Sequence, residues 1–176
     1  RVYTGTHQLL SALAHVHKKG FVHRDVKPLN VMLESDLADP DIKYNHWVLT
    51  DFNVASEEKT EKEARLDSLY TTASATSLTG FTQFYASPEQ LRGEKIDERS
   101  DLYSLAVTFF EALTGELPMG ANIDPHEINP NLSRNYADFF KKALQRDPKK
   151  RFKSAEEMKE ALILTEKGKY GGGTIF

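Results

Sequence analysis

The segment from Ser100 to Gly115 is the strongest constraint on how this chain folds. Apolar residues lie in almost every direction around a helix drawn through it, and such a helix is usually buried at the centre of a domain. Gly115 can end the helix in a left-handed conformation. At 176 residues we expect one domain arranged around this helix. The apolar residues are Leu102, Tyr103, Leu105, Ala106, Val107, Phe109, Phe110, Ala112 and Leu113.

Three further helices are predicted from the spacing of apolar residues. The first covers about residues 5–19 and ends at Gly20. The second begins at Ser133. The third begins at Ser154, which forms a predicted capping box with Glu157 three residues later. The chain is therefore expected to be mainly helical.

Short extended segments complete the expected fold. Residues 21–22 are extended, and residues 31–33 and 47–49 are predicted as two short strands because they are apolar and flanked by turn-forming residues. The intervening residues 34–46 contain Asp, Pro and Asn and are expected to form a long hairpin loop. From residue 56 to about residue 80 the pattern is lost, so we expect a loop with no core of its own. The predicted fold class is mainly α with short β-hairpins.

Composition excludes several classes of function. The chain has 23 Lys and Arg against 26 Asp and Glu, a net charge of −3, which excludes a broad basic surface for nucleic acid. It has no cysteine, which excludes disulfides, Cys-ligated zinc, iron–sulfur clusters and thiol catalysis, and fits a reducing, cytoplasmic setting. No apolar run is long enough to span a membrane.

The segment from His23 to Asn30, HRDVKPLN, carries the clearest chemical signal. It resembles the catalytic loop of protein kinases, H-R-D-x-x-x-x-N, with the Lys-Pro pair of the serine/threonine branch. Phosphoryl transfer needs a carboxylate that accepts the proton of the attacking hydroxyl, and the resemblance gives this role to Asp25. Lys27 can offset the charge on the γ-phosphoryl group of ATP, and Asn30 can supply an oxygen to Mg²⁺.

Two further motifs follow in the order of the same family. Asp51-Phe52-Asn53 resembles the metal-binding D-F-G motif, with Asn in place of Gly, and implies that Asp51 binds Mg²⁺. Asn is among the residues best able to adopt a positive φ. Ser87-Pro88-Glu89 resembles the A-P-E motif that ends the activation segment, with Ser in place of Ala. Thr82 matches the family threonine that contacts the catalytic aspartate and lysine, although Phe81 replaces the usual glycine before it.

Two more residues are matched as structural elements of the family. Asp101 resembles the aspartate that braces the backbone of the catalytic loop, and Ala106 stands at a position that is usually Gly. Arg151 matches the arginine that pairs with the A-P-E glutamate, here Glu89. His23 is interpreted as a packed residue. Arg24 is a candidate to bind a phosphate on the activation loop, where six hydroxyl residues are candidate acceptors: Thr71, Thr72, Ser74, Thr76, Ser77 and Thr79.

The resemblance covers only the larger, C-terminal lobe of a kinase. Residues 1–167 are expected to form this lobe, with an activation segment at 51–89 that includes the D-F-G-like residues 51–53, and residues 168–176 a flexible tail. No G-x-G-x-x-G and no V-A-I-K is present, so the N-terminal lobe is expected to be absent from this chain. We therefore expect the 176 residues alone to bind ATP poorly and to transfer phosphate slowly or not at all. The helix that most kinases have between Pro118 and Ser133 is expected to be shortened or lost.

Three functions remain open from the sequence. The leading hypothesis is a serine/threonine protein kinase lobe that uses ATP and Mg²⁺ on a protein substrate, with Asp25, Lys27, Thr82, Asn30 and Asp51 in the site. The second is a pseudokinase or truncated lobe that acts as a binding module, which Asn53, Ala106 and the missing N-terminal lobe favour. The third is a small-molecule kinase of similar fold, against which the Lys-Pro pair and the Ser-Pro-Glu segment argue.

Overall fold

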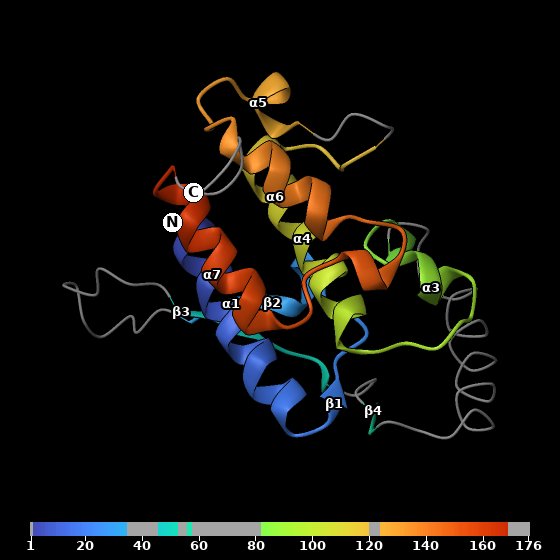
Figure 1. Ribbon diagram of the computed structural model, residues 1–176. Helices are drawn as coiled ribbons and strands as arrows, with labels where there is room; N and C mark the ends of the chain where they lie inside the picture. Colours follow the sequence, from blue (N-terminus) through green and yellow to red (C-terminus); the bar gives the residue numbers. More distant parts are fainter. Residues whose placement is uncertain (1, 35–45, 53–55, 58–81, 120–123, 169–176) are drawn as a thin grey trace, which may run out of the picture.

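The computed structural model describes residues 2–34, 46–52, 56–57, 82–119 and 124–168. In this part the chain is mainly helical, with two small two-stranded sheets beside the helices (Figure 1). The α-helices are α1 (Val2–Lys18), α3 (Pro88–Leu91), α4 (Glu98–Thr114), α5 (Pro125–Ile128), α6 (Asn135–Ala143) and α7 (Ala155–Glu166). The 3-10 turns are η1 (Pro28–Asn30), η3 (Thr82–Phe84) and η4 (Pro148–Lys150), and the strands are β1 (Phe21–Val22), β2 (Val31–Glu34), β3 (His46–Leu49) and β4 (Ser56–Glu57).

Helix α4 is the buried central helix that the sequence predicted. Nearly every residue from Ser100 to Phe110 is buried. The helix starts at Glu98, two residues before the expected start, because the Asp97 side chain accepts a hydrogen bond from the Arg99 amide at 2.9 Å and caps it. Gly115 ends the helix at a φ of 76°, the left-handed conformation that glycine adopts without steric cost.

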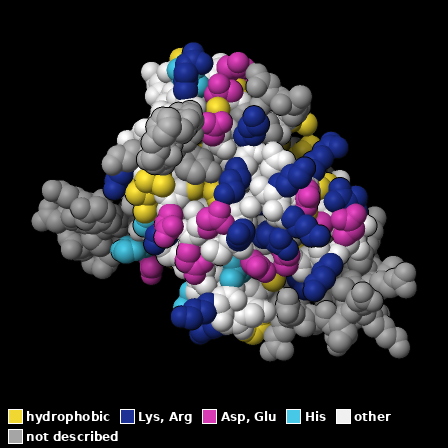
Figure 2. Space-filling view, viewed as in Figure 1, with side chains coloured by type: hydrophobic (Ala, Val, Ile, Leu, Met, Phe, Trp, Pro, Cys, Tyr) yellow, Lys and Arg dark blue, Asp and Glu magenta, His cyan; other side chains and the backbone are white. Residues whose placement is uncertain are grey.

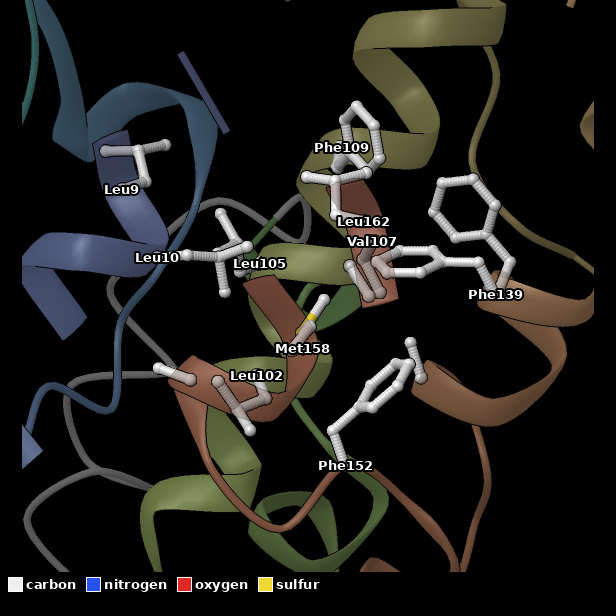
Figure 3. Packing of buried hydrophobic residues seen from close by; sticks show 14 of the residues in the cluster. Leu9, Leu10, Leu102, Leu105, Val107, Phe109, Phe139, Phe152, Met158 and Leu162 are labelled. Carbon is white, nitrogen blue, oxygen red and sulfur yellow. The ribbon is translucent and has the colours of Figure 1, made fainter. Parts of the chain in front are cut away.

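The core forms where α1, α6 and α7 pack against α4. Figure 3 shows Phe109 of α4 near Phe139 of α6, with Leu162 of α7 between the helices. The rings of Phe109 and Phe139 meet edge to face, with centroids 6.1 Å apart, a geometry that aromatic pairs favour. The largest fully buried side chains come from all four helices and the turn before α7: Leu9, Leu10, Leu13, Leu102, Leu105, Phe109, Phe110, Phe139, Phe140, Phe152, Met158 and Leu162.

Helix α1 lies between α7 and the hairpin β2–β3 (Figure 1). It starts at Val2, earlier than the expected residue 5, and the Trp47 ring packs against its Gly5 so closely that no side-chain carbon fits there. The Gln8 side-chain oxygen Oε1 accepts a hydrogen bond from the Trp47 amide at 2.9 Å. The first turn of the helix is thus fixed by β3, which the spacing of apolar residues did not reveal.

The two sheets confirm one strand pairing and correct another. Strands β2 and β3 pair antiparallel, with Val31 opposite Leu49, as the hairpin prediction required. Residues 35–45 of the predicted hairpin loop lie outside the described residues. The expectation of irregular chain from residue 56 is wrong at its first two residues, because β4 pairs antiparallel with β1. The paired residues lie 34 and 36 positions apart in the sequence, so this is not a local hairpin.

The smaller helices agree with the sequence in outline. Between Pro118 and Ser133 the described residues contain only the four-residue α5, a shortened helix as expected. Helix α6 starts at Asn135, whose amide hydrogen bonds to the Ser133 hydroxyl at 3.3 Å. Ser154 caps α7 by accepting from the Glu157 amide at 3.2 Å, but the Glu157 carboxylate accepts from Lys153 at 2.7 Å and not from the cap residue. The capping box is therefore only half formed.

A membrane-crossing helix needs about 20 mostly apolar residues. None of the helices in the described ranges is both long and apolar enough to cross a membrane.

Candidate active site

Three of the predicted site residues meet in one hydrogen-bonded cluster within the HRD loop, residues 23–30. Lys27 Nζ donates to Asp25 Oδ2 at 2.7 Å, and Asn30 Nδ2 donates to the same oxygen at 2.9 Å. Asn30 Nδ2 also donates to the Asp25 backbone carbonyl at 2.8 Å. The Asp25 side chain is 21% exposed and the Lys27 side chain 10% exposed, so the carboxylate is reachable while its cationic partner is largely covered.

The backbone before Asp25 is held by a buried carboxylate from α4. Asp101 Oδ2 accepts from the His23 amide at 2.8 Å, and Asp101 Oδ1 accepts from the Arg24 amide at 2.7 Å. Arg24 has a φ of 71°, a conformation that costs a non-glycine residue about 1–3 kcal/mol and persists only where the surroundings enforce it. Asp101 therefore braces the loop, as the resemblance implied.

His17 of α1 completes this bracing and was not recognised from the sequence as part of it. Its Nε2 lies 2.8 Å from Asp101 Oδ2, and since a carboxylate only accepts, the nitrogen donates. His17 lies 84 residues before Asp101. Nothing in the local sequence pattern around His17 points to α4.

Asp51 follows a residue that is bonded directly to the HRD loop. The Thr50 amide donates to the Asn30 carbonyl at 2.8 Å, and the Thr50 carbonyl accepts from His23 Nε2 at 3.0 Å. On the other side of Asp51, the Phe52 ring meets the buried His23 ring edge-on, with centroids 4.6 Å apart. These contacts hold the backbone of Asp51 beside Asn30. Asp51 itself has a φ of 65° and is exposed.

The remaining predicted residues lie at the edge of the described chain. Thr82 is the first residue of η3. Asn53 and all six candidate phosphate acceptors between Thr71 and Thr79 lie outside the described residues. After η3, α3 starts at Pro88 behind Ser87, and Gln90 of α3 donates from Nε2 to the Arg24 carbonyl at 2.8 Å. This contact also escaped the sequence interpretation.

Glu89 of α3 forms a buried ion pair with Arg151. Ser100 Oγ adds a hydrogen bond to Glu89 Oε1 at 2.6 Å. Burial by itself would raise the pKa of Glu89, but the hydrogen bonds from Arg151 and Ser100 outweigh it and lower that pKa from 4.5 to about 2. The pairing matches the one implied by the A-P-E resemblance, and it fixes α3 to the rest of the helical domain.

A cavity of about 460 Å³ opens beside the HRD loop. Its walls are largely apolar and come from the loop, the hairpin and α4; among them are Leu29, Val31, Leu33, Trp47 and Ala112. Lys27, Tyr85 and Glu111 also line it, and the Tyr85 hydroxyl donates to Glu111 Oε2 at 2.6 Å. Burial, with the nearby Glu111 carboxylate, raises the pKa of Tyr85, so the phenol stays protonated and keeps donating. The cavity adjoins the cluster around Asp25.

Charges of both signs are interspersed over the face shown in Figure 2. Within the described residues there is no group of three or more His, Cys, Asp or Glu side chains arranged to hold a metal ion. The metal ligands predicted at the HRD loop are instead one carboxylate and one amide, Asp51 and Asn30. Such a set suits a hard cation that takes its other ligands from a bound phosphate.

Comparisons with known proteins agree with the resemblance seen in the sequence. The family model described as a protein kinase domain matches residues 2–163. The chain is 32% identical over 171 residues to the serine/threonine-protein kinase PknB of Mycobacterium tuberculosis, covering 89% of this chain and 25% of PknB. A probable serine/threonine-protein kinase of Clostridium perfringens is 32% identical over 165 residues, covering 86% of this chain and 22% of that protein. The chain thus spans about a quarter of the length of these curated relatives.

A solved structure resembles the fold as well. The crystal structure of the Mycobacterium tuberculosis PknI kinase domain superimposes with a TM-score of 0.66 at 25% sequence identity. The match covers 93% of this chain and 54% of the PknI chain.

Proposed function

The chain belongs to the protein kinase domain family, and on that premise we propose that it is the larger lobe of a serine/threonine protein kinase. Its reaction is transfer of the γ-phosphate of ATP to a serine or threonine hydroxyl of a protein. The observation that carries this proposal is the cluster in which Lys27 and Asn30 both donate to one oxygen of Asp25. A lobe kept only for binding has no chemical need of this arrangement.

We assign the general base role to Asp25. Lys27 and Asn30 occupy Oδ2, so Oδ1 is the oxygen assigned to the substrate hydroxyl, which it orients and deprotonates as the phosphoryl group is transferred. Lys27 contacts the same carboxylate directly, at 2.7 Å, and supplies positive charge where negative charge develops on the phosphoryl oxygens. The exposure of Asp25 is consistent with access by a protein substrate.

Asn30 and Asp51 are the residues that would hold Mg²⁺. The Asn30 amide nitrogen donates to Asp25, so the amide oxygen is the atom available as a ligand. The hydrogen bond from the Thr50 amide to the Asn30 carbonyl keeps the backbone of Asp51 close to Asn30. Carboxylate and amide oxygens are the donors that Mg²⁺ prefers. When bound with ATP, the metal neutralises charge on the phosphates. Lys27 is also assigned to the nucleotide phosphates.

Thr82 is proposed to position the acceptor hydroxyl, by carry-over from the family motif.

The domain boundaries proposed from the sequence are a lobe over residues 1–167 and a tail over residues 168–176. We also propose that the 176 residues alone are a poor kinase, because they correspond to 54% of the PknI domain. In the family, a Gly-rich loop and a strand lysine of the N-terminal lobe bind the phosphates of ATP, and neither motif occurs in the 176 residues.

The deciding experiment measures transfer of radiolabelled γ-phosphate from ATP to myelin basic protein. It compares the natural full-length polypeptide with the 176-residue chain, each with and without Mg²⁺. We expect Mg²⁺-dependent transfer by the full-length protein and little by the chain alone. Asp25→Asn should lower kcat by about 10²–10⁴-fold, the usual contribution of a general base.

The matched control is Glu160→Gln, which removes an exposed carboxylate on α7, away from the HRD loop. It should leave the rate unchanged. Absence of transfer by the full-length wild-type protein, or equal rates for wild type and Asp25→Asn, would overturn the proposal and favour the binding-module alternative.

A further inference from the structure

Gln90 is placed so that both ends of its side-chain amide are used. Ser87 donates to Gln90 Oε1 from its backbone amide and from its hydroxyl, each at 2.9 Å. Nε2 donates to the Arg24 carbonyl at 2.8 Å. The orientation of the amide is fixed by its partners, since a backbone N–H only donates and a carbonyl only accepts. Gln90 therefore connects the start of α3 to the HRD loop across 66 residues of sequence.

The carbonyl that Gln90 holds belongs to the peptide group linking Arg24 to Asp25. Asp101 holds the amide on the other side of Arg24, at 2.7 Å. The two anchors come from different helices, α3 and α4, and they grip a residue whose φ of 71° is unfavourable without them. Rotation of this peptide group would swing the Asp25 Cα and its carboxylate away from Lys27 and Asn30.

Helix α3, which carries Gln90, is itself held in place by buried contacts. Glu89, the residue before Gln90, is buried in the ion pair with Arg151 and accepts from Ser100. The Leu91 amide donates to the Ser87 carbonyl at 3.1 Å, and this hydrogen bond closes the turn that carries Gln90. The position of Gln90 is thus determined by the buried ion pair of the residue before it and by the closed turn.

We propose that Gln90 is a positioning residue for the reaction. It sets the direction of the Arg24–Asp25 peptide group and thereby the geometry of the Asp25 carboxylate. This inference rests on the proposed kinase function. Gln90 also couples α3 to the HRD loop. Helix α3 lies at the end of the segment that begins with Asp51, and a shift of this helix would move the general base without any contact to substrate or nucleotide.

The test uses the natural full-length polypeptide carrying Gln90→Met, Gln90→Glu and the control Leu91→Gln. Met keeps the length of the side chain but makes neither hydrogen bond. Glu can still accept from Ser87 but places an oxygen against the Arg24 carbonyl. Leu91 is the next residue of α3 and is exposed. We expect kcat to fall about threefold to tenfold for Gln90→Met and further for Gln90→Glu, with KM for ATP and protein within about twofold. Leu91→Gln should match wild type.

A second readout follows hydrogen–deuterium exchange of peptides covering residues 21–28, with α4 peptides as the measure of intact folding. Amides of Arg24 and Asp25 should exchange faster in both Gln90 variants, while α4 is unchanged. Wild-type kcat or wild-type exchange at residues 21–28 in Gln90→Met would overturn the inference, as would a rise in KM alone. If the wild-type protein transfers no phosphate, the proposed function fails, and the exchange result still decides whether Gln90 holds the loop.

Discussion

Arg151 donates from Nη1 and Nη2 to the two carboxylate oxygens of Glu89, at 2.6 and 2.7 Å, although 62 residues separate the two in sequence. Both side chains are almost completely buried. Arg151 uses its remaining donors on backbone carbonyls, including that of Gln145 at 2.7 Å, and its guanidinium lies over the Tyr103 ring. The pair is therefore fully satisfied, and it joins α3 to the turn before α7.

Removing one partner of this pair should destabilise the protein strongly. Arg151→Met leaves the Glu89 carboxylate buried without its counter-charge, so the free energy of unfolding in urea should fall by about 3–5 kcal/mol. Replacing both partners, with Glu89→Leu and Arg151→Met together, should cost less than Arg151→Met alone. The control is Arg92→Met, which breaks the exposed pair with Glu94 and should have no measurable effect. Equal effects of Arg92→Met and Arg151→Met would contradict the prediction.

The same pair predicts how stability depends on pH. The pKa of Glu89 is about 2 in the folded protein, against an ordinary 4.5, because hydrogen bonds from Arg151 and Ser100 outweigh the effect of burial. Since the folded pKa is lowered, the contribution is fully present above about pH 4.5 and is lost as the pH falls towards 2. A lowering of this size corresponds to about 3 kcal/mol. The free energies of unfolding of wild type and Glu89→Gln, measured in urea, should therefore converge as the pH falls from 4.5 to 2. A constant difference between the two proteins over this range would refute the prediction.

Gly5→Ala tests the contact between α1 and β3. In an exposed helix this change stabilises by about 1 kcal/mol, but here the added carbon would overlap the Trp47 ring, and overpacking costs about 1–3 kcal/mol. The steric term should win, so thermal unfolding should show a lower Tm. In a Trp47→Val background the same substitution should be neutral or stabilising. A higher Tm in the wild-type background would show that the ring moves aside freely.

Asp101→Asn should loosen the HRD loop. The Asp101 carboxylate accepts from His17, His23 and Arg24, and an amide would turn its N–H₂ group towards at least one of these donors. A buried donor left unpaired costs about 1–3 kcal/mol, so urea unfolding should show a loss of that size and the His23 and Arg24 amides should exchange faster.

The control for Asp101→Asn is Asp124→Asn at the N-cap of α5. Its acceptor contact from the His126 amide can be kept by an Asn oxygen. It should leave both stability and exchange at the HRD loop unchanged. A similar loss in the two variants would mean that three-way bracing by Asp101 has no special importance.

Periodicity was enough to predict the main helices, because apolar residues at helical spacing must share one buried face. It placed α4 at the centre and located α1, α6 and α7 within a few residues. It missed the start of α4, where Asp97 adds a cap, and β4, whose only described partner is the distant β1. Helix ends and short strands depend on single polar contacts or on remote partners, which an apolar pattern does not record.

The candidate site divides in the same way. The sequence by itself determined the reactive groups, because Asp25, Lys27 and Asn30 lie within six residues and a short loop brings them together wherever it is placed. Only the tertiary structure decided how that loop is held: His17 lies 84 residues from Asp101, Gln90 lies 66 residues from Arg24, and Arg151 lies 62 residues from Glu89. Each of these bonds joins segments that are far apart in the sequence and whose relative positions are set by packing of the common core, and no local pattern carries that information.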